Sequence, residues 1–149
     1  MQMRVKYLFD NIPELISSPD NSGYDIRAAI DEPLRIPAYG KACIPTGIAV
    51  ELSGVPSYAN IASAELQVRP RSGHTRQGIV AQFGTIDISY RGEISVNIFN
   101  HNACEVEIQP LERIAQLVVC PIFKPAVIKV DRLTPTARGD KGFGSSGKD

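Results

Sequence analysis

Prolines are spread along the whole chain and leave little room for long helices. The 149 residues include 11 prolines, and a proline inside a helix removes a hydrogen bond and clashes with the preceding turn. Between the prolines, apolar residues form short runs rich in Val and Ile, bounded by Gly, Pro, Asn or Asp. These runs are predicted to be strands, at residues 5–9, 42–52, 58–68, 78–83, 94–99, 105–108, 114–123 and 126–130.

Many short strands at similar spacing are typical of an all-β sandwich or barrel, and we predict a jelly-roll-like β-barrel. One short helical turn is expected after Arg71, with Ser72 as the N-cap of residues 73–77. The chain is long enough for one domain with a buried core, which we place at residues 1–133. Residues 134–149 are rich in Gly, Ser and charged residues, so a flexible C-terminal tail is predicted there.

The net charge and the cysteines indicate which binding partners and which cellular location to expect. Lys plus Arg number 16 and Asp plus Glu number 16, so the net charge is zero. This balance gives no reason to expect a nucleic-acid or membrane partner. The cysteines are odd in number and lack metal-ligand spacing, and Cys43 and Cys120 lie in apolar runs that predict small core residues. With no apolar signal core in residues 1–10, a cytoplasmic location is expected.

The segment 69–73, Arg-Pro-Arg-Ser-Gly, follows a predicted strand. Pro70 favours an extended Arg69, and a helical turn that starts at Ser72 and Gly73 would present N–H groups to phosphate oxygens. The guanidinium of Arg71 is a forked donor that also suits phosphate. The alternative from these residues alone is a strand-ending turn with a surface arginine.

Strand-like runs flank residues 84–93, which therefore predict a hairpin. Its backbone donors and acceptors could pair with the edge of a flat base. Asp87, between apolar neighbours, could orient a water and take its proton, while the ring of Tyr90 could pack under a sugar. A hairpin with a turn-capping Asp and a packed Tyr is the alternative, and the residues alone slightly favour it.

Three further segments carry weaker signals. Residues 138–147 combine Arg138, serines and glycines with a lone Phe143, a composition that suits phosphates and base stacking but is also typical of a disordered end. Asp25 precedes an alternating run and could be a turn acid. Arg113 and Gln116 are the polar side chains that enter a strongly apolar strand, where a core hydrogen-bond network and substrate contact are both open.

Taken together, these segments resemble the five ordered motifs of the trimeric dUTPase family. The matching stretches are SGYDIRA, PRSG, GTIDISYRGE, ERIAQLVV and RGDKGFGSSG, between residues 22 and 147. The resemblance implies a jelly-roll β-barrel and a homotrimer with active sites shared between subunits. It also implies Mg²⁺-dependent hydrolysis of dUTP to dUMP and pyrophosphate, which limits uracil in DNA and supplies dUMP for thymidylate synthesis.

The same resemblance implies roles for individual residues. Asp87 would position the water that attacks the α-phosphorus, and Asp25 would lie near the water shell of the metal, which no residue would ligate directly. Tyr90 would pack under the deoxyribose and leave no room for a 2′-hydroxyl. The other substrate-binding residues implied are Arg71, Ser72, Gly73 and Gln116 for the phosphates, Ala81, Thr85, Ile86 and Ser95 for uracil, and Arg138, Phe143, Gly144 and Ser145 for closure over the substrate.

The chain departs from the family pattern at four places. His74 stands where an apolar residue usually follows PRSG, and Ala81 stands where many members have an Asn that helps to bind uracil. Gln82-Phe83 precedes Gly84 where a small residue or Pro is usual, and Ser89 replaces a frequent acid. Two other classes stay open: the related dCTP deaminases, which need a different acid arrangement, and dUTPase-like regulators that bind another protein.

Overall fold

The computed structural model describes residues 1–55 and 62–140, and nearly all the regular structure there is β-strand. One five-residue helix, α1 (Ser72–Arg76), interrupts the strands. The strands are β1 (Gln2–Tyr7), β2 (Tyr24–Arg27), β3 (Leu34–Ile36), β4 (Lys41–Pro45), β5 (Ile48–Ser53), β6 (Ala62–Arg69), β7 (Ile79–Ala81), β8 (Gly84–Ile86), β9 (Ser95–Asn100), β10 (Val106–Ile108) and β11 (Arg113–Phe123).

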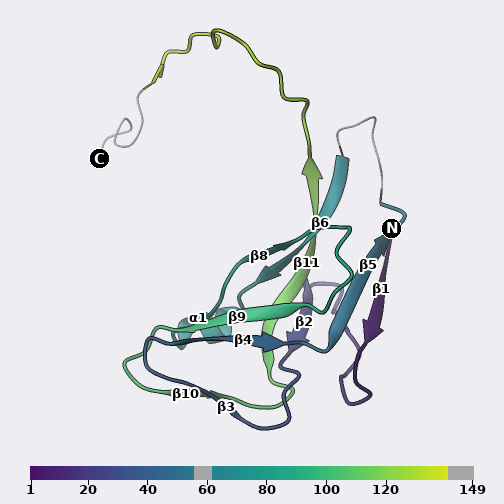
Figure 1. Ribbon diagram of the computed structural model, residues 1–149, viewed down its shortest axis with the longest axis vertical. Helices are drawn as coiled ribbons and strands as arrows, with labels where there is room; N and C mark the ends of the chain where they lie inside the picture. The colour runs from purple at the N-terminus through teal and green to yellow at the C-terminus, as the bar shows by residue number, and fades with distance from the viewer. Residues whose placement is uncertain (56–61, 141–149) are drawn as a thin grey trace.

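Four small antiparallel sheets form the body. The largest has the order β2-β11-β6-β8, and it lies near a second sheet of order β4-β9-β7 (Figure 1). The pairs β1-β5 and β10-β3 complete the body. Consecutive strands therefore often lie in different sheets, which is the connectivity of a jelly-roll-like barrel, as the sequence predicts.

Apolar side chains from all four sheets meet in one core. Its largest fully buried members are mostly isoleucines, because branched side chains pack well on a pleated surface. They are Ile26, Ile36, Ile44, Ile48, Ile98, Ile108, Ile114 and Leu117. Burial alternates along β9, where Val96, Ile98 and Asn100 point inward. One shared core explains why such short strands are stable together.

The sequence predicts one strand at residues 42–52, but the structure has two strands there, in different sheets. Thr46 and Gly47 separate β4 from β5. Gly47 has a φ of 68°, and a Cβ there would lie 2.7 Å from Cγ1 of Ile12. Glycine is required at this corner for both its backbone conformation and the close contact.

Several other sequence expectations need correction. Residues 126–130 form no strand and are exposed, because no neighbouring strand in the described chain pairs with them. Ser72 is the first residue of α1 and not its cap, since Arg71 occupies the N-cap position with extended backbone and makes no side-chain capping bond. Cys43 is exposed on the outer face of β4, so it is not a core residue. Part of the strand expected at 58–68 lies outside the described residues.

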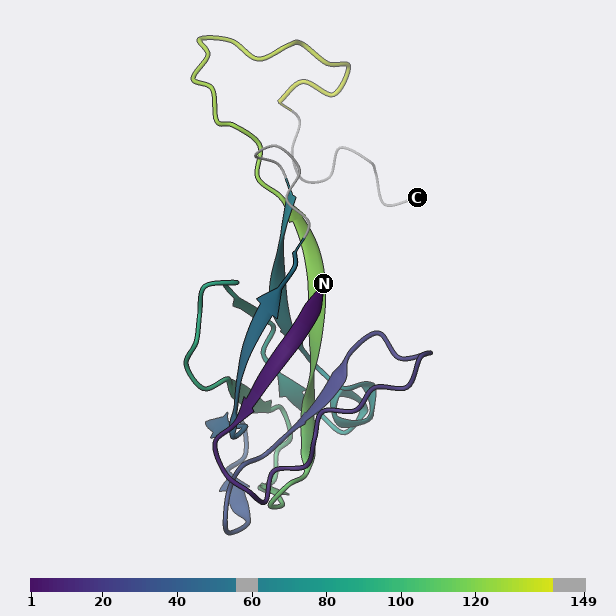
Figure 2. The ribbon, with the colours of Figure 1, turned by 90° about the vertical axis from the view of Figure 1, so that its right-hand side faces the viewer.

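The chain leaves the body after β11. Residues 124–140 run away from all the sheets and contain no helix or strand (Figures 1 and 2). In the two described ranges, no helix has the length and apolar character needed to cross a membrane.

Candidate active site

The strand order β2-β11-β6 brings three of the sequence segments together. On β11, Gln116 pairs with Asp25 of β2 on one side and with Arg69 of β6 on the other. Because β6 runs directly into α1, Arg71 lies beside the same part of the sheet. Residues that are far apart in the sequence thus meet at one place.

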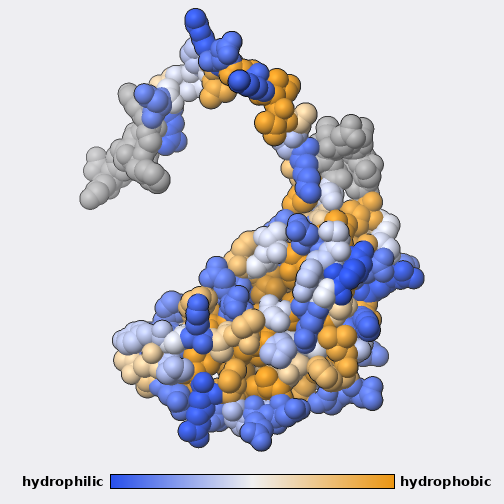
Figure 3. Space-filling model, in the orientation of Figure 1, coloured by the Kyte–Doolittle hydropathy of each residue, from blue (hydrophilic) through white to orange (hydrophobic). Residues whose placement is uncertain are grey.

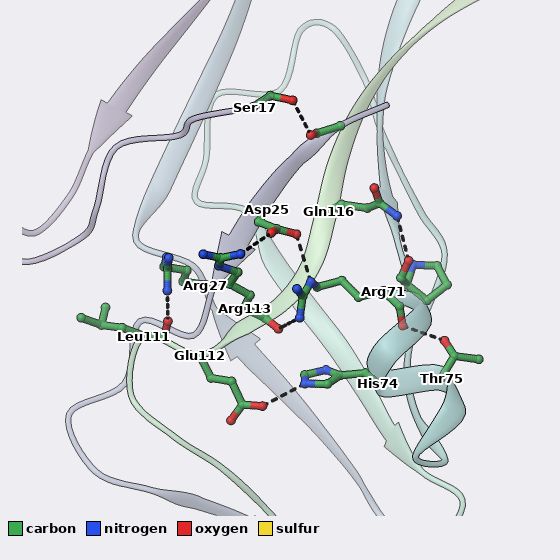
Figure 4. Close-up of polar contacts among 12 residues, drawn as sticks. Ser17, Asp25, Arg27, Arg71, His74, Thr75, Leu111, Glu112, Arg113 and Gln116 are labelled. Atoms are coloured by element: carbon green, nitrogen blue, oxygen red, sulfur yellow. Dashed lines mark hydrogen bonds and ion pairs between the residues drawn. The ribbon is translucent and has the colours of Figure 1, made fainter. Parts of the chain in front are cut away.

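Asp25 lies between two guanidinium groups (Figure 4). Nε of Arg71 donates to Oδ1 of Asp25 at 3.0 Å, and Nη1 of Arg113 donates to Oδ2 at 3.3 Å. Arg71 also donates through Nη1 to the carbonyl oxygen of Arg113 at 3.0 Å. The forked side chain of Arg71 is therefore fixed by two acceptors, and its remaining N–H groups are held ready for an anion.

These side chains border a hollow of about 600 Å³. Its lining is almost entirely polar, with more guanidinium groups than carboxylates. The lining residues are Asp20, Asn21, Ser22, Gly23, Asp25, Arg69, Arg71, Ser72, Gly73, Arg113, Gln116 and Val118. A polar, open, arginine-rich hollow of this size suits a phosphate chain better than an apolar ligand.

The start of α1 forms one side of this hollow. The N–H and the hydroxyl of Thr75 both donate to the carbonyl oxygen of Arg71, each at 3.0 Å, which fixes the first turn. A Cβ at Gly73 would meet nothing within 4 Å, so the backbone there is open to a ligand. The amide of Gln116 donates to the carbonyl oxygen of Pro70 at 3.0 Å and joins β11 to the turn.

Two further arginines line the hollow: Arg69, to which the sequence analysis gave no role, and Arg113, for which it left a hydrogen-bond network open. Arg69 is held by the side-chain oxygen of Gln67, at 2.9 and 2.7 Å, and donates to the sulfur of Cys120 at 3.1 Å. Arg113 contacts Asp25 as described above. The alternation of polar residues Glu65, Gln67 and Arg69 along one face of β6 is the signal that could have found Arg69.

His74 joins α1 to the start of β11. Its side chain is buried, and its Nε2 lies 2.9 Å from Oε1 of Glu112. The other carboxylate oxygen of Glu112 accepts the backbone N–H of Gln109 at 2.8 Å. The residue that departs from the family pattern therefore makes a polar contact where an apolar side chain could only pack. Its Nδ1 is buried and has no hydrogen-bond partner among the described residues.

A second hollow, of about 340 Å³, lies at the end of β8. It is lined by Thr85, Ile86, Asp87, Tyr90, Glu93, Ile94 and Ser95. The N–H of Tyr90 donates to the carbonyl oxygen of Asp87 at 2.9 Å, which closes the turn between them. The carboxylate of Asp87 is exposed at the rim, where it can reach a water.

The two hollows have no lining residue in common among the described parts of the chain. The side chain of Ala81 belongs to the core at 2% exposure, so its contact with a base stays a prediction for its backbone. Arg138 is exposed on the segment after β11, while Phe143, Gly144 and Ser145 lie outside the described residues. In residues 1–55 and 62–140, the predicted site residues therefore fall into two separate groups.

Comparison with known proteins agrees with this geometry. The dUTPase family model matches residues 12–147 of the chain. The chain belongs to the dUTPase family. A deoxyuridine 5′-triphosphate nucleotidohydrolase of Arabidopsis thaliana is 43% identical over 87% of the chain and 73% of its own length. The protein of the same name from Chlamydia pneumoniae is 42% identical over 91% of the chain and 90% of its own length.

Solved dUTPase structures share the fold. The Staphylococcus bacteriophage 80alpha dUTPase with dUpNHpp superposes with a TM-score of 0.83, at 28% identity and 98% coverage of both chains. Its fold matches the jelly-roll-like barrel of this dUTPase family member. The family match spans all five sequence motifs, and residues from four of them line the two hollows.

Proposed function

We propose that the chain hydrolyses dUTP to dUMP and pyrophosphate. The observation that carries the proposal is the arginine-rich hollow at Arg71 and Arg113, which is built from the motifs of a family whose named members act on this nucleotide. The reaction removes dUTP, which would otherwise place uracil in DNA, and yields the precursor of thymidylate. An enzyme of this kind is a nucleotide pyrophosphohydrolase.

The second hollow is proposed to bind the nucleoside. Backbone groups of the hairpin near Thr85, Ile86 and Ser95 would pair with uracil, and cytosine would leave them unpaired because its donors and acceptors are reversed. The ring of Tyr90 would lie under the deoxyribose. Asp87, at the rim, would orient a water toward the α-phosphorus and take its proton.

The phosphates are proposed to lie in the arginine-rich hollow. Arg71 is oriented by Asp25 and by the Arg113 carbonyl, so its free N–H groups need no reorganisation to bind phosphate oxygens. The open backbone at Ser72 and Gly73 would add N–H donors. Gln116 would contact the same chain of phosphates. These contacts strengthen as negative charge grows on the leaving pyrophosphate.

Magnesium is proposed as the cofactor. In residues 1–55 and 62–140, no three His, Cys, Asp or Glu side chains lie together in a way that could hold a metal ion. The donor set that fits is the triphosphate and water, which Mg²⁺ commonly keeps around it, with Asp25 near that water shell. When bound, the ion neutralises part of the phosphate charge. A structural Mg(II) ion is described for the dUTPase of phage phi11 of S. aureus.

A homotrimer with shared sites is the proposed assembly. Two observations support it: the hollows are separate within one chain, and the segment after β11 exposes apolar side chains (Figure 3). Val127 is 98% exposed and Leu133 is 85% exposed, which is costly for an unpaired segment. Residues 134–149, with Arg138, Phe143, Gly144 and Ser145, would close over the substrate of the assembled site. Exposed Cys43 and Cys104 suit a reducing cytoplasm.

Pyrophosphate release with Mg²⁺ from dUTP, dCTP, dTTP and UTP tests the proposal. We expect rapid release from dUTP alone. Release from all four would keep the phosphate hollow but discard the role of the hairpin. Ammonia release from dCTP would instead favour the deaminase class, and loss of all turnover with retained binding would favour a regulator of another protein.

A further inference from the structure

The ring of Tyr90 lies directly over the backbone of Gly92. A Cβ built on residue 92 would be 2.6 Å from Cζ of the ring and 3.0 Å from Cε2, and closer still to the hydroxyl oxygen. Gly92 is not among the glycines with positive φ. Its backbone conformation is therefore open to other residues, and it is the approach of the ring that requires glycine here.

The hydroxyl group at this same end of the ring has a fixed partner. It donates to the carbonyl oxygen of Glu93 at 3.0 Å. The neighbouring Arg91 donates through Nη1 to the carbonyl oxygens of Ile88, at 2.6 Å, and of Tyr90, at 2.8 Å. The turn that carries Tyr90 is thus closed on itself, and the ring is held although 48% of the residue is exposed.

Glu93 is in turn anchored to the corner between β4 and β5. Its Oε1 accepts the N–H of Gly47 at 2.8 Å, and the N–H of Ile94 donates to the carbonyl oxygen of Ile48 at 2.9 Å. The carbonyl that holds the Tyr90 hydroxyl therefore belongs to a residue fixed to the barrel. A path of hydrogen bonds leads from the barrel to the ring.

The ring of Tyr90 can exclude the 2′-hydroxyl of a ribose only if the ring stays in place. Adding or removing a group of that size in a pocket that can adapt changes selectivity by only about 10–200-fold. In the 340 Å³ hollow, Tyr90 is the aromatic side chain of the lining. A small displacement of this ring would admit a further oxygen atom, so selectivity depends on what fixes the ring.

We infer that Gly92 and Glu93 set the discrimination between dUTP and UTP, because they determine where the ring of Tyr90 lies. The inference rests on the proposed function of this hollow as the nucleoside site. Both are positioning residues that act through Tyr90. Gly92 leaves the space that the ring occupies, and Glu93 supplies the anchored acceptor.

The variant Gly92→Ala tests whether Gly92 leaves the space that the Tyr90 ring needs. The ring is the movable end of a half-exposed side chain, so we expect it to shift while the barrel stays folded. The ratio of kcat/KM for dUTP to that for UTP should fall at least tenfold, mainly through KM. Gly84→Ala is the matched control, because its Cβ would lie 3.6 Å from Cβ of Val68, an ordinary contact, and should leave the ratio within twofold.

Two variants of Glu93 test whether its anchoring to the barrel positions the Tyr90 ring. Glu93→Ala removes the acceptor for the Gly47 N–H and should lower the dUTP to UTP ratio by about fivefold or more. Glu93→Gln retains a side-chain oxygen at that place and should recover most of the ratio. A residue needed only for folding would change the amount of folded protein and not the ratio, so thermal unfolding of each variant is measured beside the kinetics.

The outcomes separate the inference from the proposed function. A wild-type chain that does not hydrolyse dUTP refutes the proposed function. A wild-type chain that prefers dUTP, with the ratio unchanged in Gly92→Ala, overturns the inference alone. A wild type that cleaves dUTP and UTP equally overturns the inference and the role of Tyr90 against the ribose, while dUTP hydrolysis itself stands. If Gly92→Ala fails to fold, the two Glu93 variants decide. The inference is overturned if Glu93→Ala, Glu93→Gln and the wild type all have the same dUTP to UTP ratio of kcat/KM.

Discussion

At the scale of single residues, the two hollows present different polar groups. The arginine-rich hollow holds its side chains by hydrogen bonds between them, with Asp25 and Arg71 at its centre. The rim of the second hollow presents Asp87 as an exposed carboxylate. Substitutions in the two places are therefore expected to have different kinetic signatures.

Asp87→Asn is predicted to remove turnover and keep binding. The amide can still hold a water but cannot take its proton, and general-base assistance contributes about 10²–10⁴-fold to a rate. We expect kcat to fall at least 100-fold, while the dissociation constant for dUpNHpp changes little. Steady-state kinetics and calorimetric titration measure the two effects. A fall in kcat of less than about tenfold would remove Asp87 from the role of base.

Arg71→Lys is predicted to behave almost as Arg71→Ala does. One guanidinium reaches both Oδ1 of Asp25 and the carbonyl oxygen of Arg113, and a single ammonium group cannot keep this geometry and also contact phosphate. Loss of a positioned phosphate donor costs about 10²–10³-fold in kcat. Kinetics of both variants with dUTP check this, and Arg76→Lys, at the end of α1, is the control. Near wild-type activity in Arg71→Lys would show that charge alone suffices.

At the scale of elements, the connections between short strands carry much of the fold. Asn100 is buried at the end of β9, and its amide donates to the carbonyl oxygens of Ile36, Pro37 and Cys104. Its side-chain oxygen accepts the N–H of Asn102 at 2.9 Å. One side chain thus joins β9 to the end of β3 and to the loop before β10.

Asn100→Ala is predicted to destabilise the fold by about 2–4 kcal/mol, because it leaves buried carbonyl and N–H groups without partners. Asn97→Ala is the matched control, since Asn97 lies on the exposed face of the same strand and should change stability by about 0.5 kcal/mol or less. Denaturant unfolding at one fixed protein concentration measures both. Equal stability of the two variants would contradict the role given to Asn100.

The fold class could be read from the sequence more securely than the strand boundaries. The Val/Ile-rich runs at 94–99 and 114–123 predict β9 and β11 within one residue at each end, whereas the run at 5–9 misses the first three residues of β1. The short strands β2, β3 and β8 carry too few residues for a period. The split at Thr46 and Gly47 depends on Ile12, which lies far away in the sequence, and no local pattern contains that contact.

The same limit applies to the site. Arg71, Asp87 and Tyr90 lie in recognisable motifs, so the sequence could point to them. That Asp25 contacts Arg71 depends on β2 and β6 lying on either side of β11 in the sheet, which sequence spacing alone does not give. Ala81 is a position where the sequence does not show burial: its side chain belongs to the core, and contact of its backbone with a base stays a prediction.

At the scale of the whole molecule, the chain has two features that support the proposed shared-site trimer. Its hollows are lined by separate residues, and the segment after β11 extends past the last sheet with apolar side chains that no part of the described body covers (Figures 1 and 3). Burial of such side chains against other copies of the chain would provide the free energy for assembly.

The double variant Val127→Asp, Leu133→Asp is therefore predicted to weaken assembly without unfolding the barrel. Neither side chain belongs to the core of one chain, being 98% and 85% exposed, so a single folded chain should tolerate both changes. In the trimer, the new carboxylates would be buried without partners, which is strongly unfavourable. The mass measured by sedimentation should shift from three times 16.2 kDa toward 16.2 kDa, and dUTP turnover per chain should fall on dilution.

The control is the double variant Lys129→Ala, Asp131→Ala on the same segment, which should keep the trimer. A monomeric double variant with full activity would mean that one chain closes its own site, and the shared-site proposal would then be wrong.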